Sequence, residues 1–173
     1  MPHMKKILFG LMAVAAMLTA CNMKDKADYT PAIVVSDYFY IISDTADYAV
    51  DSLRFGYDVK AECYRTDTAK VNDTIQFALG LLGYGNNLTS FTMTWNPELI
   101  RVLDMPQTYQ SAAFNSVALE EGSFEIVFKP GFLMIGLPVT YTTLSAGASA
   151  VEMTLNSESE FSPVHSKFFA PCQ

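Results

Sequence analysis

Apolar side chains occupy every second position over most of the chain that follows Pro31. The longest example runs from Leu53 to Cys63, where apolar residues alternate with glycine or charged residues. The same period appears in four shorter segments, 75–81, 91–95, 124–128 and 151–155. A period of two predicts strands that bury one face and leave the other in water.

Turn-forming residues separate these segments. Gly, Pro and Asn cluster between them, most densely at Gly83–Asn87, and such residues favour turns. No window shows a convincing helical period, and the best candidate for a helical turn is Ser111–Glu120. Eight or so short strands in about 140 residues predict an all-β chain, folded as a single antiparallel β-sandwich over residues 32–173.

The first 20 residues have the pattern of a secretory signal peptide. Lys5 and Lys6 precede an apolar stretch, Ile7–Leu18, and small residues follow it. A positive segment, a short apolar segment and small residues before a cleavage site are typical of such signals. The apolar stretch is too short to cross a bilayer as a helix, which needs about 20 residues.

The four residues at the end of this stretch, Leu18-Thr19-Ala20-Cys21, resemble the lipobox of bacterial lipoproteins. The resemblance implies cleavage before Cys21 and diacylation of its thiol, and two acyl chains anchor a protein stably to a membrane. Residues 21–31 are then a lipidated, flexible tether, and the protein is an outer membrane lipoprotein of the cell envelope. The residues after Cys21 carry charges of both signs, so they do not indicate whether the protein lies on the periplasmic or the outer face of the membrane. The alternatives are a plain secretory signal and an uncleaved anchor.

The charge of the mature chain excludes two classes of partner. The whole chain has 11 Lys and Arg against 18 Asp and Glu. Removing the signal takes away two lysines and no acid, which leaves a net charge of −9. Such a surface repels nucleic acid and anionic lipid head groups, so we expect membrane contact through the lipid alone and no nucleic-acid partner.

Two further cysteines, Cys63 and Cys172, remain in the mature chain. Outside the cytoplasm an even pair favours a disulfide over a metal site. This disulfide would close a long loop and contribute roughly 4–5 kcal/mol in loop-entropy models. The alternative is two unpaired thiols.

Two segments resemble cohesin-like and related immunoglobulin-like sandwiches. In Leu88–Leu103 an alternating strand ends in Trp-Asn-Pro and resumes with an apolar pair, and Val139–Ser157 resembles the closing hairpin of bacterial immunoglobulin-like modules. The resemblance covers about a fifth of the chain and implies an immunoglobulin-like sandwich topology. It implies no activity, and nothing in it identifies a binding surface.

Four further segments resemble the O-glycosylation signal D-[S/T]-[A/I/L/V/M/T] of Bacteroidota envelope proteins. They are Asp44-Thr45-Ala46, Asp51-Ser52-Leu53, Asp67-Thr68-Ala69 and Asp73-Thr74-Ile75. The acceptors that the resemblance implies are Thr45, Ser52, Thr68 and Thr74. Asp before Thr or Ser is also ordinary at turns, so the alternative is that none of the four carries sugar.

The residues for catalysis or metal binding are scarce. The mature chain has one histidine, His165, so no multi-histidine metal site can form, and we expect a surface side chain. There is no G-x-S-x-G, and Gly80–Gly85 lacks the lysine of a phosphate loop. The nearest acid pairs, Glu120-Glu121 and Glu158/Glu160, lie in turn-like polar segments. We therefore predict no enzyme, no metal and no cofactor.

Aromatic residues are the remaining candidates for binding. Trp95 is in phase with the buried positions of its segment, and Tyr38-Phe39-Tyr40 must place aromatic rings on both faces of a strand. Tyr84 and Tyr109 lie in predicted loops and are the candidate ligand contacts. The sequence predicts a non-catalytic envelope lipoprotein for adhesion, assembly or scaffolding. The alternative is a glycan-binding accessory lipoprotein of a saccharide-uptake system, and a small hydrolase is a more distant third.

Overall fold

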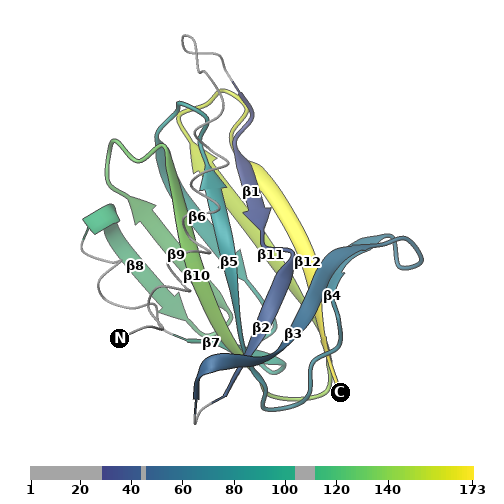
Figure 1. Ribbon diagram of the computed structural model, residues 1–173. Coiled ribbons are helices and arrows are strands. Elements are labelled where there is room, and N and C mark those ends of the chain that lie inside the picture. The colour runs from purple at the N-terminus through teal and green to yellow at the C-terminus, as the bar shows by residue number, and fades with distance from the viewer. Residues whose placement is uncertain (1–28, 44–45, 104–111) are drawn as a thin grey trace.

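The computed structural model describes residues 29–43, 46–103 and 112–173. These residues form twelve strands, shown in Figure 1. The strands are β1 (Ala32–Val35), β2 (Tyr38–Ser43), β3 (Ala46–Asp58), β4 (Cys63–Thr66), β5 (Thr74–Leu82), β6 (Leu88–Thr94), β7 (Ile100–Val102), β8 (Phe114–Glu120), β9 (Ser123–Phe128), β10 (Met134–Thr143), β11 (Gly147–Ser157) and β12 (Val164–Cys172). Within this part of the chain, no helix is long and apolar enough to cross a membrane.

The strands pair into two sheets that share β3. The first sheet has the order β7-β10-β5-β2-β3, and β1 also pairs with β5. The second has the order β3-β4-β12-β11-β6-β9-β8. Residues 46–54 of β3 pair with β2, and residues 55–58 pair with β4. The predicted all-β sandwich is confirmed, with antiparallel pairing except between β4 and β12, which run parallel.

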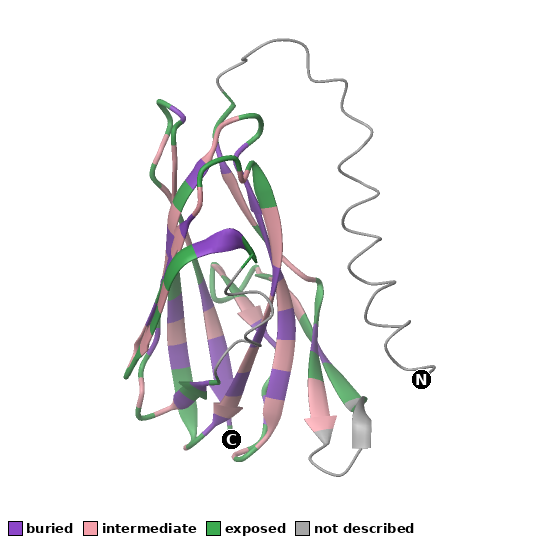
Figure 2. Cartoon of the chain, turned by 90° about the vertical axis from the view of Figure 1, so that its left-hand side faces the viewer, coloured by how far each residue is buried: buried purple, intermediate pink, exposed green. Residues whose placement is uncertain are grey.

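The core lies between the two sheets, and the alternation seen in the sequence determines which side chains enter it. Figure 2 shows buried bands alternating with partly or fully exposed bands along the strands. The predicted apolar positions are buried in four segments: 75, 77, 79 and 81; 91, 93 and 95; 124, 126 and 128; and 151, 153 and 155. Burying apolar surface contributes about 25 cal/mol per Å², so these stripes supply the main driving force for joining the sheets.

One predicted strand, Leu53–Cys63, is in fact two strands. β3 ends at Asp58 and β4 begins at Cys63, so the residues between them form a hairpin turn. The Asp58 carboxylate accepts hydrogen bonds from the backbone N–H of Lys60 at 2.9 Å and of Ala61 at 3.2 Å. These local bonds compete with extended pairing, which is why an unbroken alternation in sequence is interrupted in the structure.

Two other expectations need correction. The segment 139–157 is not a hairpin, because β10 pairs with β5 and β7 while β11 pairs with β12 and β6 in the other sheet. Of the helical candidate Ser111–Glu120, the described residues 112–113 are helical, and residues 114–120 form β8 against β9. In both cases long-range pairing, which periodicity does not report, determined the outcome.

Candidate binding surfaces

His165 and the glutamate pair Glu120-Glu121 lie in different parts of the described structure. A depression of about 330 Å³ has Glu120, Glu121 and Arg101 at its lining, together with Trp95, Pro97, Ile100, Val102, Gly122 and Leu144. His165 lies elsewhere, exposed on β12, where its Nδ1 is 3.0 Å from the Thr154 hydroxyl. No group of three metal-ligating side chains occurs in the described part of the chain.

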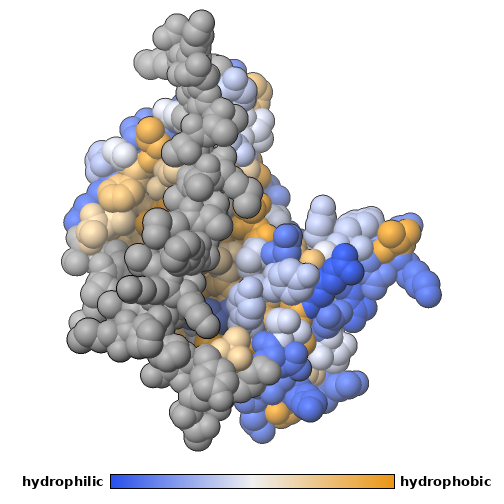
Figure 3. Space-filling view, viewed as in Figure 1, coloured by the Kyte–Doolittle hydropathy of each residue, from blue (hydrophilic) through white to orange (hydrophobic). Residues whose placement is uncertain are grey.

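The β3–β4 hairpin extends away from the sandwich as an arm, at the right of Figure 1. Figure 3 shows a small hydrophobic patch near its end among hydrophilic residues. Val59, in the turn, is 79% exposed, and Tyr57 and Tyr64 are 54% and 51% exposed. Tyr57 is directly opposite Tyr64 in the hairpin, so the two rings share one face.

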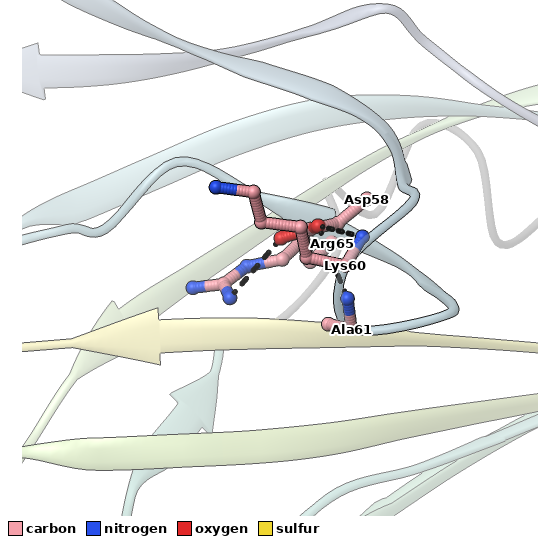
Figure 4. Close-up of polar contacts among 4 residues, drawn as sticks. All are labelled: Asp58, Lys60, Ala61 and Arg65. Carbon is pink, nitrogen blue, oxygen red and sulfur yellow. Dashed lines mark hydrogen bonds and ion pairs between the residues drawn. The ribbon is translucent and has the colours of Figure 1, made fainter.

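The turn of this hairpin is fixed by the Asp58 carboxylate, as Figure 4 shows. Besides the two backbone N–H groups, the carboxylate has Nη1 of Arg65 at 3.5 Å. The hydrogen bonds from Ala61 and Lys60 are the main reason that the pKa of Asp58 lies below its ordinary value of 3.8, and the Arg65 charge adds to the effect. The arm therefore has a defined turn although it is solvent-exposed.

A row of aromatic rings connects this exposed face to the core. Phe39 stacks on Phe77 with centroids 4.3 Å apart, and on Phe55 at 5.5 Å. Phe55 stacks in turn on Tyr64 at 5.8 Å, and Tyr64 makes an edge contact with Tyr57 at 5.2 Å. Phe39 and Phe77 are buried and Phe55 is partly buried, so the inner rings hold the outer rings in place, and a rigid aromatic ring loses little conformational entropy on binding.

The outer face of the first sheet is a second exposed surface. Phe39 points into the core, and its neighbours Tyr38 and Tyr40 point outward and are 49% and 47% exposed. The prediction that this tripeptide places rings on both faces is thus confirmed. Gln76 and Thr140 lie beside Tyr40 on this face, because β5 pairs with both β2 and β10.

The predicted modification sites differ in exposure. Ser52 is exposed on β3, Thr68 is exposed in the loop after β4, and Thr74 is half-buried at the start of β5 with its hydroxyl 3.4 Å from that of Thr142. Thr45 lies outside the described residues, as does Cys21 with the signal peptide and most of the tether. Modification at these sites stays a prediction.

The two predicted ligand tyrosines do not form a site in the described structure. Tyr84 is partly exposed in the β5–β6 turn, where its ring meets that of Tyr29 edge-on at 6.2 Å. Tyr109 lies outside the described residues. The Ser159 hydroxyl donates a hydrogen bond to the backbone carbonyl oxygen of Tyr29, with the two oxygens 3.2 Å apart. The end of the expected tether therefore contacts the sandwich.

For Cys63 and Cys172 the structure favours the alternative of two unpaired thiols, since both are free in it. β4 and β12 run parallel with Phe169 opposite Arg65, which puts Cys63 level with Lys167. Cys172 lies farther along β12 than Lys167, and at about 3.3 Å per residue this places it about 16 Å from Cys63. A disulfide requires Cα atoms within about 7 Å of each other, and this register prevents that.

Sequence reasoning missed Tyr57 and Tyr64 as exposed residues. Tyr57 is in phase with Leu53 and Phe55, so the alternation assigned it to the buried face. That face loses its cover where the hairpin leaves the second sheet, since β4 pairs with β12 only at Arg65. The only sequence signal was the Asp58 side chain, whose preference for turns was outweighed by the alternation around it.

No family model and no curated protein matches the sequence. Among solved structures, a cohesin module from a family 33 glycoside hydrolase of Clostridium perfringens is 13% identical, with 70% of this chain and 95% of that chain covered and a TM-score of 0.42. CaCohA2 from Clostridium acetobutylicum is 16% identical, with 60% and 85% covered and a TM-score of 0.44. A DUF4466 family protein from Parabacteroides merdae is 8% identical, with 83% of this chain but 44% of that chain covered and a TM-score of 0.46. At these values the likeness says nothing of activity or partner.

Proposed function

We propose that this chain is a non-catalytic lipoprotein of the cell envelope, anchored to the outer membrane through lipid on Cys21, that serves adhesion or assembly. Its contact element is the β3–β4 hairpin, and its partner is a protein. The observation that carries the proposal is the pair of half-exposed tyrosine rings, Tyr57 and Tyr64, held on a projecting arm by stacking on the core. Tyrosine is enriched among the residues that dominate binding energy in protein interfaces.

The backbone of the arm also favours a protein partner. β3 pairs with β2 only as far as Arg54, so Gly56–Asp58 have no strand on the side away from β4 within the described structure. Unpaired N–H and C=O groups along an edge can accept an added strand from another protein. A partner strand would satisfy these groups and cover the adjacent tyrosine rings together.

Site-specific photo-crosslinking on intact cells of the native host tests this proposal. A photoreactive residue replaces Val59 in the full-length lipoprotein, and a matched variant carries it at Phe161, which is 48% exposed in the β11–β12 loop. We expect a discrete crosslinked protein from position 59 and none from position 161.

Substituting the two tyrosines is the second part of the experiment. Adding Tyr57→Ser and Tyr64→Ser to the position-59 protein should abolish that species, because losing two anchor residues at about 2 kcal/mol or more each lowers affinity by a factor of hundreds. A crosslinked species that persists in the double variant, or appears equally from position 161, contradicts the proposal.

A further inference from the structure

A straight row of neutral polar side chains crosses the outer face of the first sheet. Thr140 is paired with Gln76, Gln76 with Tyr40, and Tyr40 with Ser52. Residues directly opposite in an antiparallel sheet share a face, so these four side chains form one line across β10, β5, β2 and β3. At about 4.8 Å between strands, the row spans about 14 Å.

Side chains next to the row extend it into a platform. Tyr38 points the same way as Tyr40 on β2, about 6.7 Å along the strand. On the other side, Thr142 is paired with Thr74, and their hydroxyl oxygens are 3.4 Å apart. The platform thus combines two half-exposed phenol rings with hydroxyl and amide groups.

Hydrogen bonds within the platform orient its polar groups before any ligand arrives. The Gln76 amide donates one hydrogen bond to the Thr140 hydroxyl, at 3.3 Å. The other amide N–H and the carbonyl oxygen of Gln76 have no partner in the described part of the chain. An oriented amide with a free donor and a free acceptor suits a ligand that is rich in hydroxyl groups.

The charges around this face determine what kind of ligand it fits. The strand registers place two charged side chains on it, both at its margins: Arg101 beside Thr142, and Arg54 opposite Tyr38. Arg101 also lines the depression that contains Glu120 and Glu121. Both arginine charges are positive and lie beyond the ends of the row or beside it, whereas the side chains of the row itself are neutral. A ligand seated over the row therefore meets uncharged donors and acceptors.

We propose that the outer face of the first sheet is a binding site for a neutral glycan. The apolar C–H face of one sugar unit lies on the rings of Tyr38 and Tyr40, and hydroxyl groups of this unit and its neighbours in the chain bond the amide of Gln76 and the hydroxyls of Thr140 and Ser52. Neutral hydroxyls on the ligand match the neutral donors and acceptors of the row. This site is separate from the hairpin contact, and each of the two proposals can be correct without the other.

Isothermal titration calorimetry of the full-length lipoprotein in detergent tests the site. The ligands are the neutral hexasaccharides cellohexaose, xylohexaose, mannohexaose and maltohexaose, with hexagalacturonate as the acidic comparison. We expect at least one neutral hexasaccharide to bind. Binding to none of them at millimolar concentration, or tighter binding of hexagalacturonate, overturns the proposal.

Variants place the binding on this face. Tyr38→Ala with Tyr40→Ala should raise the Kd of the bound hexasaccharide at least tenfold, and Gln76→Leu should raise it severalfold. Phe161→Ala, which removes an exposed ring far along the chain, should leave it unchanged. A Kd in the tyrosine double variant within twofold of the wild-type value overturns the assignment.

A measurement on the unmodified protein makes the test independent of variant folding. In an NMR titration of the wild-type chain with the same hexasaccharide, the largest amide shifts should fall at Tyr38–Tyr40, Gln76 and Thr140. Shifts centred on Tyr57–Tyr64 or Tyr84 instead would show that the glycan binds elsewhere and overturn the site.

Discussion

Replacing Phe39 by alanine should destabilise the whole sandwich. Phe39 is fully buried and lies where the two sheets and the hairpin meet. Its ring is parallel to that of Phe77 at 4.3 Å, stacks on Phe55 at 5.5 Å and meets the edge of Phe168 at 5.6 Å. One substitution therefore removes contacts to β5, β3 and β12 together.

The expected cost follows from the burial and the ring contacts of Phe39. Truncating a fully buried phenylalanine costs about 3–5 kcal/mol, because transfer free energy is lost and a cavity remains. Three aromatic neighbours favour the upper part of that range, since each ring pair adds about 0.5–1.5 kcal/mol beyond area burial. Phe39→Leu keeps most of the volume and should cost about 1–2 kcal/mol.

Urea unfolding followed by tyrosine and tryptophan fluorescence measures these differences. For a domain of this size a loss of 3–5 kcal/mol also lowers Tm by about 6–20 °C. Phe161→Ala is the matched control, since its ring is 48% exposed and such surface changes usually stay within about 0.5 kcal/mol. A cost for Phe39→Ala below about 1.5 kcal/mol, or equal to that of Phe161→Ala, would refute the packing described here.

Two further predictions concern the hairpin turn and the thiols. The pKa of Asp58 is depressed in the folded protein, so its bonds to Lys60 and Ala61 are present above the ordinary carboxyl pKa and are lost as pH falls through the folded-state value below 3.8. NMR should show those two amides shifting together with a midpoint below 3.8, and a midpoint above it contradicts the bonding. Under native conditions maleimide should label Cys63 and leave buried Cys172 unmodified until the protein unfolds, whereas a mass loss of 2 Da from both together would indicate a disulfide.

Much of the fold was predictable because burial follows a local rule. The side-chain period of a strand is two, so Phe91, Met93 and Trp95 had to share a face, and all three are buried. The scarcity of histidine and the absence of catalytic motifs were equally local observations. They predicted no reaction centre, and that stays a prediction.

Strand partners were not predictable in the same way. The alternation in 139–157 is the same whether β10 and β11 pair with each other or lie in different sheets. The spacing of Cys63 and Cys172 likewise contains no information on register, and a parallel β4–β12 pair keeps them apart. Pairing depends on residues far apart in the chain, whose contacts form only when both sheets have assembled.

The sequence by itself therefore determined the strand character of the chain, the buried positions in the four segments 75–81, 91–95, 124–128 and 151–155, and the acidic net charge. Only the tertiary structure decided that the Leu53–Cys63 segment turns back after Asp58 and leaves Tyr57 exposed to solvent. It also brought Thr140, Gln76, Tyr40 and Ser52 into one row from four separate strands. The reason is that periodicity specifies which way a side chain points, whereas cross-strand register specifies which side chains become its neighbours.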